Sequence, residues 1–100
     1  MRLGTITKQP ADFLDYDIDF SKWLVGTDLL ASLAAVVTRD DGLPLGIGDL
    51  DPRYIINNQT IAKLWLADGV DRESYKIEIT ATTDDGRVKQ VELRVRVRDV

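Results

Sequence analysis

The sequence predicts a single all-β domain, an antiparallel β-sandwich of about seven short strands. Residues 75–97 alternate apolar and polar side chains on both sides of a glycine-containing turn, which is typical of a half-buried hairpin. Turn signals recur along the chain without an internal repeat or low-complexity tract, as in a sandwich. The 100 residues, 44% hydrophobic and 30% charged, suit one globular domain.

The first thirteen residues, "MRLGTITKQPADF", lack strand alternation. We therefore expect residues 1–13 to form an N-terminal arm that orders on assembly, and residues 14–100 to form the sandwich. The arm has no apolar run long enough for a secretory signal, and nowhere do about 18 apolar residues follow one another as a membrane span requires. We expect a soluble product made in a cytoplasm, without a membrane partner.

A strand is predicted from Asp15, because Tyr16, Ile18 and Phe20 fall on one face and three aspartates on the other. The aspartates could in principle recruit a hard cation such as calcium. An EF-hand loop is excluded, since Phe20 and Gly26 stand where that loop needs glycine and glutamate. A solvated face, or one paired with Lys or Arg, is the favoured interpretation, and we predict no metal site.

The next apolar segment, residues 29–37, is continuous rather than alternating. Alanine and leucine would suit a helix, but a length of nine residues between two turn signals favours a strand covered on both faces. Residues 42–54 then concentrate glycine and proline, which indicates an irregular connection or a short edge strand. Because binding elements often lie in such loops, residues 42–58 are a candidate contact region.

A central strand is predicted over residues 60–67, "TIAKLWLA", since both of its faces are apolar. We expect Trp65 to pack between the two sheets. The alternative is that Trp23, Tyr54 and Trp65 are exposed together as a platform that stacks on sugars.

The final hairpin has its apolar side chains at odd positions on both arms, so paired residues must sum to an even number. This parity predicts a three-residue turn, Asp84-Asp85-Gly86, with Gly86 left-handed and Ile79 opposite Val91. Glu78 then faces Glu92, and a register two residues longer, which pairs Glu78 with Arg94, remains possible. Tyr75 is placed like a tyrosine corner, whose hydroxyl bonds to nearby backbone.

Basic residues follow the last strand and could give it a basic outer face that docks an acidic partner or a phosphate. The opposing interpretation is that these charges keep a sheet edge soluble. The residues are Arg87, Lys89, Arg94, Arg96 and Arg98.

The chain contains no cysteine and no histidine, which removes disulfides, thiolate chemistry and the usual general base. No phosphate-binding glycine motif occurs. A net charge of −4 argues against nucleic acid as a partner. We predict no enzymatic activity, no catalytic residue and no cofactor.

Two blocks, "KQPADFLDYDIDFSKWL" and "AKLWLADGVDRESYKIEITATTDDGRVKQVELRVRVRD", resemble small virion proteins of tailed bacteriophages that are often labelled fibre-tail adaptors. The resemblance extends from about Lys8 to Arg98. Two features depart from the pattern: Thr27 is inserted in the "G-D" step, and the middle segment, residues 39–58, is longer. The matching positions are Lys8, Pro10, Leu14 to Tyr16, Asp19 to Ser21, Trp23, Leu24, Lys63 to Leu66, Gly69, Tyr75, Ile77, Thr82, Thr83, Gly86 and Arg87.

This resemblance implies an immunoglobulin-like sandwich in the virion tail. It implies an adaptor present in several copies around the tail axis, with tail, connector or fibre proteins as partners. A head-to-tail connector or a capsid decoration protein is the alternative of the same kind. A carbohydrate-binding module in host adsorption is the alternative of another class.

Overall fold

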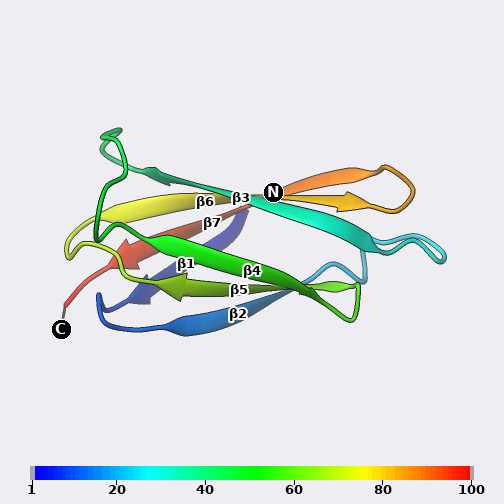
Figure 1. The fold of residues 1–100 in the computed structure, drawn as a ribbon, viewed down its shortest axis with the longest axis horizontal. Helices are drawn as coiled ribbons and strands as arrows, with labels where there is room; N and C mark the ends of the chain where they lie inside the picture. The colour runs from blue at the N-terminus through cyan, green and yellow to red at the C-terminus, as the bar shows by residue number, and fades with distance from the viewer. Residues whose placement is uncertain (1, 100) are drawn as a thin grey trace.

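The computed structural model describes residues 2–99 as an elongated sandwich of 44 × 23 × 21 Å (Figure 1). Its seven strands lie in two layers. They are β1 (Arg2–Lys8), β2 (Leu14–Asp19), β3 (Leu30–Arg39), β4 (Asp51–Asn57), β5 (Ile61–Ala67), β6 (Ser74–Thr83) and β7 (Val88–Val97).

One sheet has the order β1-β7-β6-β3 and the other β2-β5-β4. All pairs are antiparallel except β1 with β7, which is parallel. Apart from the added β1, these orders match the three-strand cores of an immunoglobulin-like sandwich. The predicted fold class is confirmed, including a strand in place of the alternative helix near residues 29–37, and a central β5. The expectation that residues 29–37 are covered on both faces is wrong, because β3 is an edge strand and Val36 on its outer face is 60% exposed.

The β6–β7 hairpin has the predicted register and turn. Ile79 lies opposite Val91 and Glu78 opposite Glu92, so the longer register is not adopted. The three-residue turn is closed by the Thr83 and Gly86 amides, which donate to the carbonyls of Arg87 and Thr83. Gly86 has a φ of 82°, as a left-handed turn position requires. The repulsion between the two glutamates is reduced by ion pairs. Lys76 lies 2.8 Å from Glu78, and Arg94 lies 3.6 Å from Glu92.

The core is an aliphatic layer between the two sheets. Alternate residues of the β6–β7 hairpin face alternate residues of β5, and all of these side chains are buried. Each such side chain contributes about 1.5–3 kcal/mol by leaving water. The buried hydrophobic residues are Phe20, Leu30, Val37, Leu50, Ala62, Leu64, Leu66, Tyr75, Ile77, Ile79, Ala81, Val91, Leu93, Val95 and Val97.

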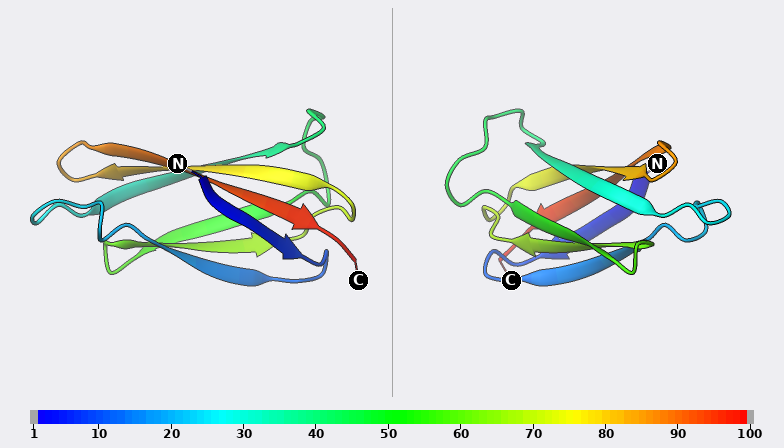
Figure 2. Two further views of the ribbon diagram at one scale, coloured as in Figure 1. Left: turned by 180° about the vertical axis from the view of Figure 1, so that it is seen from behind. Right: turned by 45° about the vertical axis from the view of Figure 1, so that its right-hand side comes forward.

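The N-terminal segment differs from the prediction of an arm over residues 1–13. Residues 2–8 form β1, which runs along β7 with Ile6 beside Val95 and Lys8 beside Val97 (Figure 2). The strand was hidden in the sequence because a register shift at Gly4, whose φ is 131°, breaks the alternation. In addition, one inward position is occupied by Lys8, which is buried. The segment that precedes β2 as a loop is therefore residues 9–13.

Tyr75 forms the predicted corner and extends it to an aspartate. Its hydroxyl accepts a hydrogen bond from the Val70 amide at 3.0 Å and donates one to Asp49 Oδ1 at 2.7 Å. The Gly46 amide donates to Asp49 Oδ2 at 2.7 Å, and the Arg39 guanidinium lies 3.1 Å from the same carboxylate. These contacts, the tyrosine bond first, hold the pKa of Asp49 below its usual value. The network joins β3, β6 and the β3–β4 loop.

Gly69, in the β5–β6 loop, packs against the end of β7. Its φ is 110°, and a Cβ atom built there would lie 2.7 Å from Cγ2 of Val97, which is buried in the core. The Gly69 amide also donates to the Gly48 carbonyl at 3.0 Å. A side chain at this position would meet both backbone strain and a steric clash.

We predict that Gly69→Ala lowers the free energy of unfolding by about 2 kcal/mol or more, since strained backbone and overpacking each cost about 1–3 kcal/mol. Urea unfolding followed by fluorescence measures the change. Gly46→Ala is the matched control, because that glycine has open space around it and no positive φ. Equal stability of the two variants would contradict the packing described for Gly69.

We predict that Asp49→Asn destabilises the fold at pH 7 and that the loss shrinks in acid. The folded pKa of Asp49 is depressed. Its carboxylate therefore adds stability that is present above the unfolded pKa of about 4 and is lost as the pH falls through the folded value. Urea midpoints of both proteins at pH 7 and pH 3 measure this. A difference that does not change with pH would mean that the carboxylate charge is not what the network uses.

Candidate functional site

The β3–β4 loop, residues 40–50, protrudes from one end of the sandwich (Figure 1). Three apolar side chains at alternate positions of this loop are exposed. Leu43 is 59% exposed, Leu45 is exposed, and Ile47 is fully exposed at 107%. Single exposed apolar residues are ordinary, but three within five residues form an apolar patch of the kind that marks a contact surface. We call Leu43, Leu45 and Ile47 the loop tip.

The base of this loop is held by charge pairs. The Arg39 guanidinium, on β3, lies 2.8 Å from Asp41 and 3.1 Å from both Asp49 and Glu73. The Asp41 bond comes first among the contacts that raise the pKa of Arg39. The Leu43 amide donates to Asp41 Oδ1 at 3.0 Å. A rigid base presents the loop tip with less conformational entropy to lose on binding. The sequence predicted a contact region here, but not Asp49 or the charge pairs.

The aspartate face of β2 is paired with a lysine. Asp15 and Asp17 lie 3.0 Å and 3.2 Å from Lys63 Nζ on the neighbouring β5, and these bonds raise the pKa of Lys63. Asp19 instead accepts a hydrogen bond from the Ser21 amide. Within residues 2–99 no three metal-ligating side chains are grouped to hold an ion. The observed contacts are those of the favoured interpretation, a face paired with a basic residue.

Trp65 does not pack between the sheets, so that prediction is wrong. The inward positions of β5 are Ala62, Leu64 and Leu66, which leaves Trp65 on the outer face of the three-stranded sheet. There it stacks on Phe13 with ring centroids 5.2 Å apart. Both phases of "TIAKLWLA" are apolar, and the aliphatic phase occupies the core. The sequence gives no signal that Phe13 covers the tryptophan.

The three predicted platform aromatics do not lie together. Trp23 follows β2 and packs against the core cluster, with the Arg87 guanidinium 4.5 Å from its ring centroid. Tyr54 is exposed on β4, where it pairs with the inward-facing Leu64 rather than with Trp65. The aromatic pair on the outer face is instead Phe13, which is exposed, with Trp65, which is half-buried.

The predicted basic outer face of β7 is not continuous. The Arg87 guanidinium stacks over the Trp23 ring, and Lys89 lines a cavity. Arg94 lies 2.9 Å from Asp40, and Arg98 donates to the Glu73 carbonyl. Arg87 and Lys89 occupy odd positions, whereas Arg94 and Arg96 occupy even positions and share the outer face of β7, where Arg96 is exposed. The basic outer face is therefore shorter than predicted.

Lys8 is a buried cation that the sequence did not indicate. Its Nζ donates to the carbonyl oxygens of Gln9, at 2.7 Å, and of Asp68. Burial lowers its pKa. The lysine ties the end of β1 to the β5–β6 loop, so its role is structural.

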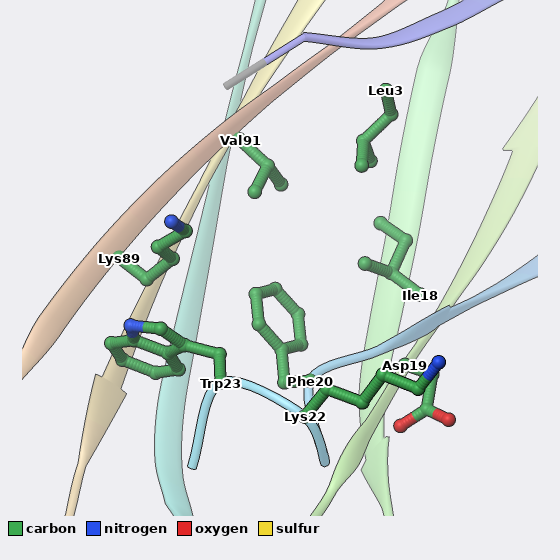
Figure 3. Close-up of a pocket in the computed structure, with 8 residues that line it drawn as sticks. All are labelled: Leu3, Ile18, Asp19, Phe20, Lys22, Trp23, Lys89 and Val91. Carbon is green, nitrogen blue, oxygen red and sulfur yellow. The ribbon is translucent and has the colours of Figure 1, made fainter.

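A cavity of about 270 Å³ opens between the sheets near the β2–β3 loop (Figure 3). Apolar side chains point into it from β1, β2 and β7, while Lys22 lies beside Asp19 at its rim. Its polar groups do not converge on one point as a catalytic site requires. The lining residues are Leu3, Ile18, Asp19, Phe20, Lys22, Trp23, Lys89 and Val91.

The solved structure of the titin M3 domain supports the fold. The titin M3 domain has a TM-score of 0.53 at 14% identity, over 98% of this chain and 90% of that chain. Amebosin has a TM-score of 0.45 at 12% identity, over 97% and 96%. No curated protein sequence matches. No helix among residues 2–99 is long and apolar enough to cross a membrane.

The family model described as "Podophage GP4 fiber-tail adaptor protein gp77" matches residues 8–96. That range contains the first sequence block on which the resemblance rests and all but the last three residues of the second. It includes every strand from β2 to β6. A structural, adaptor-type role in the virion tail follows from membership. The chain belongs to the family of podophage fiber-tail adaptor proteins.

Proposed function

We propose that this protein is a non-enzymatic adaptor that joins a tail or connector component to a tail fibre. It is made in the host cytoplasm and is present in several copies around the tail axis, without nucleic acid or membrane as a partner. The observation that carries the proposal is the family match over residues 8–96. An adaptor works through contacts alone, which agrees with a chain that has no histidine or cysteine.

The loop tip is the proposed anchor for one virion neighbour. Leu43, Leu45 and Ile47 are exposed on a loop whose base is held by Arg39 and Asp49. A few anchor side chains buried in a partner's pocket supply most of the binding energy of many interfaces. The outer-face pair of Phe13 and Trp65 is the proposed second contact, since Phe13 is 54% exposed.

We predict that Ile47→Asp reduces the fibres carried per particle at least about tenfold, because an anchor side chain contributes about 2 kcal/mol or more. Fibres are counted by electron microscopy of phage that carry the variant gene. Val25→Asp is the matched control, since Val25 is an exposed apolar residue in the β2–β3 loop.

Full fibre occupancy with Ile47→Asp would remove the loop tip from the interface. Mass spectrometry of the same particles counts the copies of the chain. If each particle carries hundreds of copies, the adaptor proposal is wrong and the chain is a capsid decoration protein. A reconstruction that places the chain between head and tail would favour a head-to-tail connector.

A carbohydrate-binding module is the second candidate function, and the stack of exposed Phe13 on half-buried Trp65 favours it. Aromatic faces bind sugars through their apolar surface. This function predicts glycan-array binding that Trp65→Ala abolishes while circular dichroism shows an intact fold. Trp23→Ala is the control, because Trp23 packs against the core cluster. Absence of binding by the native chain would reject the module.

A further inference from the structure

The outer edge of β3 is the feature that the adaptor proposal does not use. β3 is the last strand of the sheet β1-β7-β6-β3, and within residues 2–99 no strand pairs with its far side (Figure 2). It is ten residues long, and Leu30–Thr38 carries no charge, proline or glycine. Long, uncharged edges of this kind readily pair with another strand.

The other three sheet edges are protected. β1 is interrupted by the register shift at Gly4. β2 presents three aspartates on its outward face, and β4 contains Pro52 between Asp51 and Arg53. Charges, proline and bulges are the devices by which native sheets prevent edge pairing. β3 also has a register shift, but it lies between Leu30 and Ser32, at the start of the strand. Residues 32–38 are in regular register with β6 and carry no charge or proline, so this part of the β3 edge is the pairing site among the edges described.

The backbone groups that β3 leaves free follow from its register with β6. The Asp40 amide donates to the Ser74 carbonyl, and the register continues as Thr38 opposite Lys76 and Val36 opposite Glu78. Because hydrogen-bonded pairs alternate in antiparallel sheets, even-numbered residues bond to β6 and odd-numbered residues face outward. Leu33, Ala35 and Val37 therefore present their N–H and C=O groups to the open edge. Nearer the start of β3, the Leu30 amide is already bonded to the Gln59 carbonyl.

We propose that the β3 edge pairs antiparallel with β3 of a second copy of this chain, about a two-fold axis at Ala35. In this register Ala35 forms a hydrogen-bonded pair with its own equivalent, and Leu33 pairs with Val37 of the second copy. Val36, which is 60% exposed, comes to lie opposite Ala34 of the second copy. The two four-stranded sheets become one continuous sheet.

A second copy suits this edge better than an unrelated strand for two reasons. The two-fold register places no like charges opposite each other, since Arg39 falls opposite Ala31, and an isologous contact needs only this one surface. Pairing also covers Val36 and closes the edge, so that assembly stops at a dimer instead of growing into a fibre.

Sedimentation equilibrium of the full chain tests the proposal. We expect a dimer for the wild type, and at least about a tenfold rise in the dimer dissociation constant for Val36→Lys, because two added charges are brought together next to the axis. Val88→Lys is the matched control, since Val88 is 63% exposed but lies on β7, two strands away from the edge. The control should remain a dimer.

A second variant, Ala35→Pro, removes an outward N–H and leaves the bonds to β6, as proline on an edge strand can. We expect it to be monomeric with an unfolding temperature close to that of the wild type. If Ala35→Pro does not fold, the proposal is tested by the dimer dissociation constant of Val36→Lys alone. The proposal would be overturned if the wild type is monomeric up to about millimolar concentration, where even weak specific contacts bind. It would also be overturned if folded Val36→Lys or folded Ala35→Pro remains a dimer. Adaptor function would not be affected by that outcome, because the fibre count of Ile47→Asp particles measures it separately.

Discussion

The structure depends on one constraint, which is that the aliphatic face of the β6–β7 hairpin must be buried against β5. Ile77, Ile79 and Val95 are almost fully inaccessible, as are Leu64 and Leu66 from the opposite sheet. The residues between them on each strand face outward, because strand side chains alternate. This layer brings the two sheets together without a disulfide or a buried tryptophan among the described residues. It leaves the loops and outer faces free to make contacts.

Polar interactions hold the loops at the two ends of the sandwich in place. At the base of the β3–β4 loop, the carboxylate of Asp49 accepts hydrogen bonds from the Tyr75 hydroxyl and the Gly46 amide and forms an ion pair with Arg39. At the opposite end, Asp28 accepts hydrogen bonds from the amides of Leu29 and Asp85 and so holds the β6–β7 turn. A fixed loop base with an apolar tip is suited to insertion into a partner, which is the chemistry that an adaptor in a virion tail requires.

The sequence predicted the parts of the fold in which one strand phase is apolar and the other polar. Parity limited the β6–β7 hairpin to turns with an odd number of residues, because an even-numbered turn would have placed Glu92 on the core side. It did not exclude the longer register that pairs Glu78 with Arg94. Both faces of β5 are apolar, so alternation did not decide which face is inward. The expectation for Trp65 was wrong because Leu64 and Leu66, on the other face of the strand, occupy the core. The parallel pairing of β1 with β7 could not be predicted, because a bulge at Gly4 and a buried Lys8 hide its alternation. The candidate contact region, residues 42–58, was proposed from its glycine and proline content. Asp49 at its base could not be predicted, because its partners Tyr75 and Arg39 come from β6 and β3.

Native-state hydrogen exchange tests the central claim most directly, because it measures the opening free energy of each strand separately. The account predicts that the amides of Ile77, Ile79 and Leu93 exchange only through global unfolding, with the same free energy and the same dependence on denaturant. If these amides exchange through local opening while other strands remain protected, the β6–β7 hairpin is not what holds the sandwich together.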